Sequence, residues 1–179
     1  MKRGRHALRV GRIGEYLTAA ELEALSVKCD IVSQAGFDIL AWHDNKPIRV
    51  QVKSTLRPTL CCKTRKTPTY NFSCSHSGKN VMLTDKQTDI IAFCAIDIKR
   101  VRFVHVSEIS GKNHRLRIDM FDEELLEKQT WGQSVKKFTE STSMHNSEPT
   151  RRTGRKRGVS SSNLGTSGGF YDEIWPESE

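Results

Sequence analysis

The chain has 179 residues, a length that suits a single domain with one additional segment rather than two full domains. Hydrophobic residues make up 36% of the chain and its mean hydropathy is -0.56, so part of it is not expected to join a core. The formal net charge of +8 favours a polyanionic partner, with nucleic acid ahead of an acidic membrane surface. We expect a cytoplasmic, nucleoid-associated protein, because no secretion signal follows the basic N-terminus and no apolar run reaches the roughly eighteen residues of a membrane-spanning helix.

The five cysteines do not form a recognisable disulfide or metal pattern. They are Cys29, Cys61, Cys62, Cys74 and Cys94. Their odd number, without a secretion signal, argues against a disulfide framework. Cys61, Cys62, Cys74 and His76 come nearest to a metal site, but adjacent cysteines followed by a Cys-x-His pair do not have the usual zinc spacing. Structural or surface thiols are therefore favoured.

Residues 9–28 are predicted to form a helix. Apolar residues recur there at three- and four-residue steps and form one stripe: Val10, Ile13, Leu17, Ala20, Ala24 and Val27. Gly11 and Gly14 weaken the first turn and would allow another backbone to approach closely. The pattern ends at Asp30, and residues 31–32 favour a short strand.

Two strands joined by a short turn are predicted over residues 37–42 and 48–55. In the second strand three apolar side chains alternate with three long polar ones, so one face is apolar and the other presents Arg49, Gln51 and Lys53. The same alternation in the first strand sets Asp38 apart from the apolar face. The polar connection HDNKP suits a hairpin.

Further strands and a closing helix are predicted after the hairpin. YNFSCS favours a strand, and the apolar stretches DIIAFCAID and VRFVHV indicate buried strands separated by a turn at residues 97–100. MFDEELLEKQT and SVKKF are typical of a closing helical region. This order of elements predicts an α/β (α+β) layered sheet.

A change of composition divides the chain into two predicted parts. Residues 1–138 are expected to form the folded domain. Residues 139–179 are dominated by Ser, Thr, Gly and basic residues and offer little apolar surface to bury, so they are predicted to be a low-complexity basic tail that is disordered by itself. The tail ends in the acidic-aromatic stretch GFYDEIWPESE.

Three polar side chains are expected to converge on the hairpin. Gln51 and Lys53 lie two residues apart in a strand, so they point to the same side. A twisted hairpin would bring them towards Asp38. A carboxylate, an amide and an ammonium are costly to bury unpaired, so we expect a metal ion, a phosphate or solvent to satisfy them.

These groups suit the hydrolysis of a phosphodiester bond. That reaction needs a Lewis acid on the phosphate oxygens, a water molecule held in line, and compensation of developing charge. Mg²⁺, for which Mn²⁺ can substitute, prefers hard oxygen ligands. We expect Asp38 to be the main ligand, with the side-chain carbonyl of Gln51, the backbone carbonyl of Val52 and the carboxylate of Glu15 in support. Lys53 would orient or help deprotonate the attacking water.

The segments GRIGEYLTAAEL, FDILAW and IRVQVKST resemble the PD-(D/E)xK nuclease superfamily, and in particular its group I intron homing-endonuclease type. The matching positions are Gly11, Gly14 and Glu15, then Asp38, then Gln51, Lys53 and Ser54. The resemblance covers roughly residues 8–110 and places Asp89 where a strand-leading aspartate is frequent. It implies a restriction-endonuclease-like core, with a central mixed sheet flanked by helices, and a magnesium-dependent endodeoxyribonuclease. Gln51 departs from the superfamily pattern, which has an acidic residue there; the variant is common in this subgroup.

Plainer interpretations stay open for the same residues. Glu15, early in a helix, interacts favourably with the helix dipole in any case. Lys53 alone would be a solvated strand residue, and Ser54 would simply begin the following loop. Arg49 shares the face of Gln51, and it could equally contact a phosphate or simply lie at the protein surface. Asp89 is expected to lead a strand rather than to bind metal.

Three basic clusters are candidates for contact with phosphates, which position a duplex on a protein. The first precedes Glu15 and comprises Lys2, Arg3, Arg5, Arg9 and Arg12. The second lies in the loop after Lys53, and the third is RRTGRKRG, which resembles either a minor-groove arm or an import-type patch. The residues expected to contact DNA are Arg12, Arg49, Arg57, Lys63, Arg65, Lys66, Arg151, Arg152, Arg155, Lys156 and Arg157.

The leading hypothesis is therefore a metal-dependent endonuclease that cuts double-stranded DNA as a homodimer or homotetramer and has no membrane partner. A homing role is one form of it. Two alternatives remain: a nuclease selective for four-way junctions, and a DNA-binding protein without catalytic activity.

Overall fold

The computed structural model describes residues 3–34, 36–60, 67–76 and 81–146, all of which belong to one compact unit. Helix α1 (Arg3–Ala24) leads into three strands: β1 (Cys29–Gln34), β2 (Phe37–His43) and β3 (Lys46–Thr55). Short strands β4 (Thr69–Ser73), β5 (Ser75–His76) and β6 (Val81–Met82) follow. The chain continues through β7 (Ile90–Ala95), β8 (Arg100–His105), η1 (Val106–Glu108), β9 (Asn113–Arg117), η2 (Ile118–Phe121) and α2 (Leu126–Asn146).

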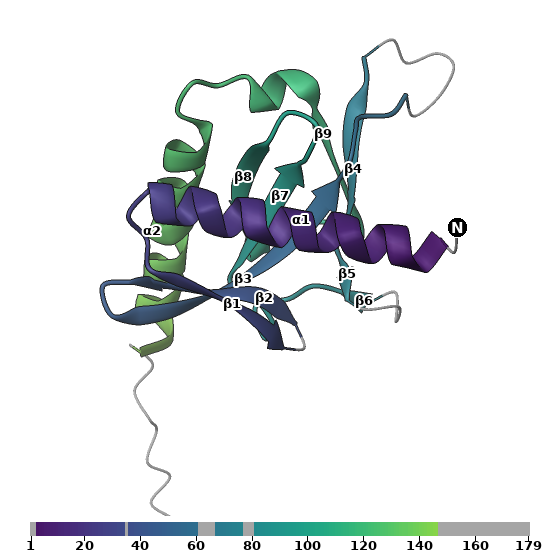
Figure 1. The fold of residues 1–179 in the computed structure, drawn as a ribbon. Coiled ribbons are helices and arrows are strands. Elements are labelled where there is room, and N and C mark those ends of the chain that lie inside the picture. Colours follow the sequence, from purple (N-terminus) through teal and green to yellow (C-terminus); the bar gives the residue numbers. More distant parts are fainter. Residues whose placement is uncertain (1–2, 35, 61–66, 77–80, 147–179) are drawn as a thin grey trace, which may run out of the picture. The chain divides into compact units, whose positions relative to one another are not determined.

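A five-stranded mixed sheet in the order β1-β2-β3-β7-β8 forms the centre of this unit (Figure 1). β3 and β7 run parallel, and the other neighbouring pairs in this sheet run antiparallel. The predicted hairpin is β2–β3, closed by Asp44 and Asn45, whose φ angles are 49° and 61°. Aspartate and asparagine tolerate this left-handed conformation, which matches the twist of a two-residue hairpin.

One face of the sheet packs against α1 and part of α2. The buried cluster on this face joins Leu22 of α1, Val50 of β3, Phe103 of β8 and Trp131 of α2. α2 also closes the outer edge of β8. The backbone N–H of Phe103 donates to Thr130 Oγ1 at 3.2 Å, and the backbone N–H of Val101 donates to Glu127 at 3.2 Å. The edge strand β8 is thereby protected from pairing with another chain.

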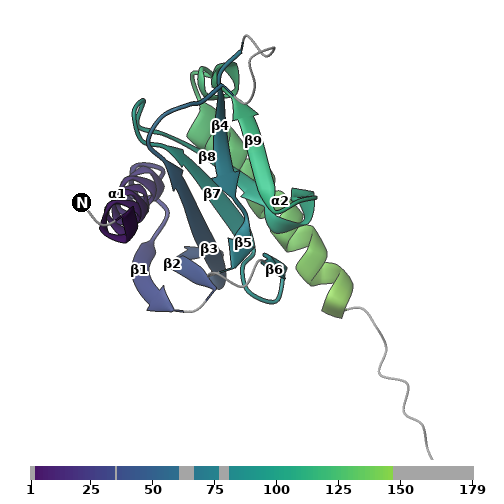
Figure 2. The same cartoon turned by 90° about the vertical axis from the view of Figure 1, so that its right-hand side faces the viewer.

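The opposite face is covered by the two-stranded sheet β4–β9 (Figure 2). Phe93 of β7 lies in a second buried cluster with Tyr70 and Phe72 of β4 and Leu116 of β9. Because alternate residues of β7 belong to the two clusters, this strand is buried on both faces. The connection from β3 to β7 thus supplies β4, one of the two strands that cover the second face.

The predicted fold class, a mixed sheet flanked by helices, is confirmed. The two helices pack on the same side and edge of the sheet, however, and the strand pair β4–β9 supplies the other layer. β9 was not predicted, because Leu116 is its one buried residue and so gives no alternating apolar pattern.

The first helix begins and ends earlier than the predicted span 9–28. Ser26 has a φ of 60°, its N–H donates to the carbonyl of Glu23, and the N–H of Val27 donates to that of Leu22. These paired bonds form a Schellman motif, which ends α1 and turns the chain into β1. At the other end, α2 runs to Asn146, so the predicted domain boundary at residue 138 falls inside this helix. Residues 147–179 of the predicted tail lie outside the described residues.

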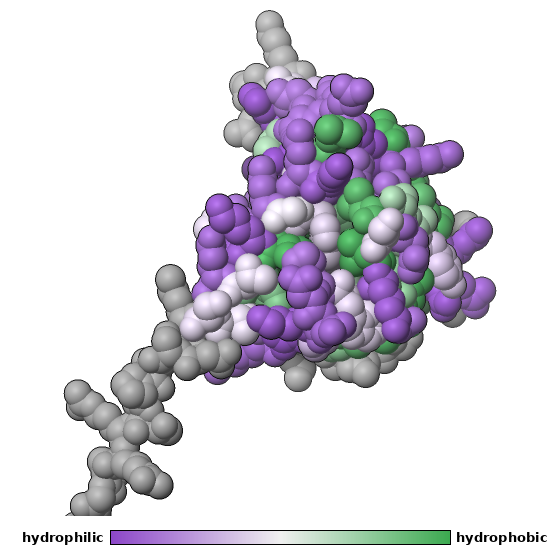
Figure 3. Space-filling model, turned by 90° about the vertical axis from the view of Figure 1, so that its left-hand side faces the viewer, coloured by the Kyte–Doolittle hydropathy of each residue, from purple (hydrophilic) through white to green (hydrophobic). Residues whose placement is uncertain are grey.

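The face shown in Figure 3 is largely hydrophilic, and hydrophobic side chains reach the surface there in separate patches. Within the described part of the chain, neither helix combines the length and the apolar character needed to cross a bilayer.

Candidate active site

Asp38 and Gln51 meet where β3 extends past the paired part of β2. Ile39 pairs with Val50, so Asp38 comes next along β2 and faces Gln51. The Asp38 Oδ2 atom accepts hydrogen bonds from the side-chain amide of Gln51 and, at 2.8 Å, from the backbone N–H of Val52. The pairing of β2 with β3 ends at Ile39 and Val50, so the aspartate side chain takes the place of a β2 backbone carbonyl as the acceptor for the N–H of Val52.

Lys53 lies beside this pair on the same face of β3. Its Nζ donates to the backbone carbonyl of Ser75 at 3.3 Å, which ties the lysine to β5. Burial lowers the pKa of Lys53, while the nearby Asp38 and the thiol of Cys74 act in the opposite direction. The lysine is thus partly desolvated and close enough to Asp38 to feel its charge.

Glu15 reaches the same place from α1, because that helix approaches β3 very closely. A Cβ atom added to Gly14 would lie 1.7 Å from Ser54 Oγ and 2.8 Å from Ser54 Cβ, so no larger residue fits there without movement. Burial raises the pKa of Glu15, the negative charge of Asp38 raises it further, and Arg12 lowers it. The negative charge of Asp38 is therefore felt at Glu15.

Burial dominates the electrostatics of Asp38 and raises its pKa. The backbone N–H of Val52, the charge of Lys53 and the amide of Gln51 all oppose this shift but do not cancel it. A cation placed between Asp38 and Glu15 would relieve both carboxylates at once.

The donor set fits a hard divalent cation that keeps several waters. It offers two carboxylates and the backbone carbonyl of Val52, all oxygen donors. No group of three or more Cys, His, Asp or Glu able to hold a metal occurs in the described ranges, so a cation here needs neutral ligands as well. Gln51 directs its Nε2 towards Asp38 and, at 3.4 Å, towards the carbonyl of Val52. To offer its oxygen to a cation, this amide would have to turn over.

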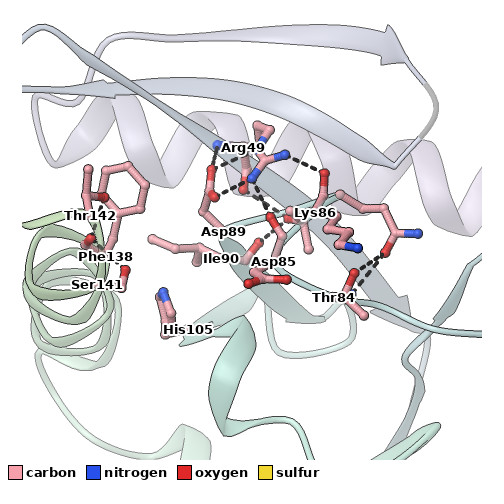
Figure 4. A network of polar contacts seen from close by, with 12 residues as sticks. Arg49, Thr84, Asp85, Lys86, Asp89, Ile90, His105, Phe138, Ser141 and Thr142 are labelled. Carbon is pink, nitrogen blue, oxygen red and sulfur yellow. Dashed lines mark hydrogen bonds and ion pairs between the residues drawn. The ribbon is translucent and has the colours of Figure 1, made fainter. Parts of the chain in front are cut away.

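Arg49 is engaged elsewhere, although it shares the face of Gln51. It forms a 2.7 Å ion pair with Asp89 and donates to the carbonyls of Asp85 and Lys86 (Figure 4). Asp89 precedes β7 and also accepts from the backbone N–H of Arg49 at 2.8 Å. This network holds the turn before β7 against β3, and it leaves Arg49 few donors for phosphate.

Of the other residues predicted to contact DNA, Arg12 and Arg57 are exposed. Arg12 lies on α1 one turn before Glu15, and Arg57 follows β3. The remaining predicted contacts lie outside the described residues: Lys63, Arg65, Lys66, Arg151, Arg152, Arg155, Lys156 and Arg157. Cys61 and Cys62 also lie outside them, and Cys29, Cys74 and Cys94 are free thiols.

A separate hollow of about 750 Å³ lies between α2 and the turn before β7. Asp89, His105 and Phe138 line it, and Figure 4 shows these side chains around the Arg49 network. Burial lowers the pKa of His105. None of the four predicted catalytic side chains lines this hollow, so it is distinct from the candidate active site.

The structure places Gln51 against Asp38, and the charge of Asp38 acts on both Lys53 and Glu15. The catalytic role of these four residues stays a prediction. Their supports were not predicted from the sequence. The Gly14–Ser54 approach was foreseen only as a general role of glycine. The Ser75 carbonyl and Cys74 had no sequence signal. Ser75 meets Lys53 through a hydrogen bond between positions 22 residues apart, and Cys74 acts on Lys53 through its charge.

No protein-family model matches the chain, and no curated protein matches it. Among solved structures, the bacterial homing endonuclease I-Ssp6803I superposes with a TM-score of 0.50 over 75% of this chain and 95% of its own chain. The fold is similar to that of a homing endonuclease. At 13% sequence identity, the likeness concerns the fold.

Proposed function

We propose that the protein is a divalent-metal-dependent DNA endonuclease with Asp38, Gln51, Lys53 and Glu15 at its catalytic centre. The observation that carries this proposal is their convergence from α1, β2 and β3 at one end of the hairpin. The similarity of the fold to a bacterial homing endonuclease supports it. A homodimer or homotetramer would allow both strands of a duplex to be cut.

In this proposal the carboxylates of Asp38 and Glu15 hold Mg²⁺ or Mn²⁺, with the carbonyls of Val52 and Gln51 as neutral ligands. The bound cation would polarise a phosphate oxygen of the scissile bond. The lowered pKa of Lys53 increases the fraction of neutral amine at a given pH, and a neutral Nζ can take a proton from the attacking water. The Ser75 carbonyl keeps that Nζ in place.

Incubation of the full chain with supercoiled plasmid and Mg²⁺ tests the proposal. Asp38→Asn and Lys53→Met should each reduce the cleavage rate by a factor of about a hundred or more, since each removes a group that acts in the transition state. Chelation of the metal should stop the reaction, and Mn²⁺ should restore it.

Two variants on the same sheet serve as matched controls. Asp30→Asn removes an exposed carboxylate on β1, and Lys46→Met removes an exposed lysine at the other end of β3. Both should cleave at the rate of the unmodified protein. Full activity of Asp38→Asn or Lys53→Met would contradict the proposal, and preferential cleavage of a four-way junction over linear duplex would instead favour a junction-resolving nuclease.

A further inference from the structure

The outer face of α1 carries a row of arginines that ends next to Glu15. Arg5, Arg9 and Arg12 follow one another at four- and three-residue steps, which places them on one side of a helix. Gly14, Thr18 and Leu22 are buried and define the side of α1 that faces the sheet. The helical repeat therefore directs the three arginines away from the sheet. We call these three residues the arginine row.

Intramolecular contacts do not account for this row. Arg5 and Arg9 are exposed, and neither has a hydrogen bond or ion pair within the described residues. Arg12 donates to the hydroxyl of Tyr16 at 3.0 Å and lies over its ring. Between residues 3 and 14 there is no acidic residue, so Glu15 is the first carboxylate on α1. Cations near a helix N-terminus are unfavourable with the helix dipole, and no ion pair of Arg5 or Arg9 with another described residue offsets that cost.

The N-terminal turns of α1 also lack the packing that stabilises most helices. All residues from Arg5 to Arg9 are exposed, and Leu8 keeps 72% of its surface accessible. A Cβ atom on Gly11 would meet nothing within 4 Å. Figure 1 shows these turns extending past the sheet. This half of α1 is therefore open to a partner along its outer side.

We propose that the arginine row binds the phosphodiester backbone of a DNA duplex beside the bond that is cut. This inference rests on the proposed function, which places the scissile phosphate near Glu15. Arg5 precedes Glu15 by ten residues, about 15 Å along the helix axis, and Arg12 precedes it by about 4.5 Å. Phosphates of one strand recur about every 3.4 Å along the duplex axis. The row thus reaches phosphates flanking the cut rather than the reacting phosphate.

Salt dependence of binding distinguishes phosphate contacts from other effects. We would measure binding of a 30-base-pair duplex to the full chain carrying Asp38→Asn, with and without Arg5→Gln and Arg9→Gln, at several salt concentrations. Loss of two phosphate contacts should reduce the slope of log K against log salt by about 1.8 and weaken binding on the order of tenfold. Glutamine keeps the helix propensity of arginine, so α1 should stay folded.

The matched control is Lys128→Gln with Lys136→Gln, which removes two exposed cations from the other long helix, α2. This pair should leave the slope unchanged. In the protein with Asp38 intact, the arginine substitutions should raise KM more than they lower kcat, because they remove binding to groups that do not react.

The outcomes separate this proposal from the proposed function. A reduced slope in a protein that cuts no DNA would support the arginine row and contradict the nuclease. Cleavage with an unchanged slope would contradict the arginine row alone. The row would also be contradicted if the unmodified chain failed to bind the duplex. A parallel measurement with phosphatidylserine vesicles would contradict it too, if the two substitutions weakened binding to the vesicles but not to the duplex.

Discussion

Asp38 is a residue whose proposed role conflicts with the stability of the fold. Burial raises its pKa above the usual 3.8, which means that the folded protein favours the protonated carboxyl. Its contribution to stability is therefore complete below the pKa that Asp38 has in the unfolded chain. This contribution is lost as the pH rises through the pKa that Asp38 has in the folded protein. At neutral pH without metal, the ionised carboxylate destabilises the protein.

Asp38→Asn should accordingly stabilise the metal-free protein at pH 7 while it abolishes cleavage. Asparagine is neutral, and its oxygen can still accept from the backbone N–H of Val52. We expect a gain on the order of 1 kcal/mol in the free energy of unfolding, measured by urea denaturation. Asp30→Asn, on the exposed edge strand, should change it by less than about 0.5 kcal/mol. A less stable Asp38→Asn protein would contradict this account of the site.

The contribution of Asp38 to the stability of the unmodified protein and the cleavage rate should respond to pH in opposite directions. The stability advantage of Asp38→Asn over the unmodified protein should shrink as the pH falls, because Asp38 then becomes protonated in the folded state. Single-turnover cleavage at fixed Mg²⁺ should instead rise with pH as Asp38 and Glu15 ionise, since both pKa values are raised. A cleavage rate that decreases as the pH rises through the pKa values of Asp38 and Glu15 would show that the ionised carboxylates are not required.

At the scale of elements, the closest approach of α1 to β3 sets the position of Glu15. Gly14→Ala would place a methyl group 1.7 Å from Ser54 Oγ, so the helix must shift or Ser54 must rotate. We expect at least a tenfold loss of cleavage, because a displacement near 1 Å is enough to impair a catalytic arrangement. A lower melting temperature should accompany it.

Gly11→Ala provides the control for this prediction, since its methyl group meets nothing within 4 Å. It should stabilise α1 by about 0.5–1 kcal/mol and leave cleavage unchanged. Adding Ser54→Gly to Gly14→Ala removes the two contacts below 3 Å, and of the three nearest atoms it leaves Val52 Cγ1 at an ordinary 3.5 Å. Cleavage should then recover in part. A Gly14→Ala protein with full activity would show that helix spacing does not position Glu15.

The elements differ in how well the sequence predicted them, and the reasons are physical. The β2–β3 hairpin was predicted because alternation and a polar turn are local signals, and the register then follows and brings Asp38 to Gln51. β9 was missed because its pairing with β4 is a distant contact. The last turns of α2 were missed because serine and threonine have low helix propensity. There Thr139 and Thr142 bond to carbonyls of the preceding turn instead of ending the helix.

The candidate site was predictable to the extent that it depends on one hairpin. Asp38, Gln51 and Lys53 share a face through strand geometry alone, whereas Glu15 was assigned through resemblance, because nothing local relates a helix residue to a later strand. Arg49 shows the limit of the alternation argument. It occupies the expected face, but its partner Asp89 lies 40 residues further along the chain and engages its guanidinium.

At the scale of the whole molecule, the net charge of +8 indicates an excess of cations. We expect individual cations to contact separate phosphates, so that each contributes its own share to the salt dependence of binding. The basic stretch RRTGRKRG contributes five cations in the segment 151–157. Changing all five to glutamine in the full chain should reduce the slope of log K against log salt by up to about 4.5 if each contacts a phosphate. Affinity should fall equally for unrelated duplex sequences, since phosphate contacts carry no direct sequence information.

Combining these five changes with Arg5→Gln and Arg9→Gln tests whether both regions hold the same duplex. Independent contacts add, so the reductions in slope should sum and the losses of binding free energy should agree within about 0.5 kcal/mol of additivity. If the slope of log K against log salt were as steep in the combined variant as in the five-residue variant, α1 would not contact the duplex that the basic stretch binds. The single-turnover kcat should change little in the combined variant, because the proposal assigns all seven residues to binding the duplex and none to the reaction. A kcat loss as large as that of Lys53→Met would contradict the division between positioning and catalytic groups.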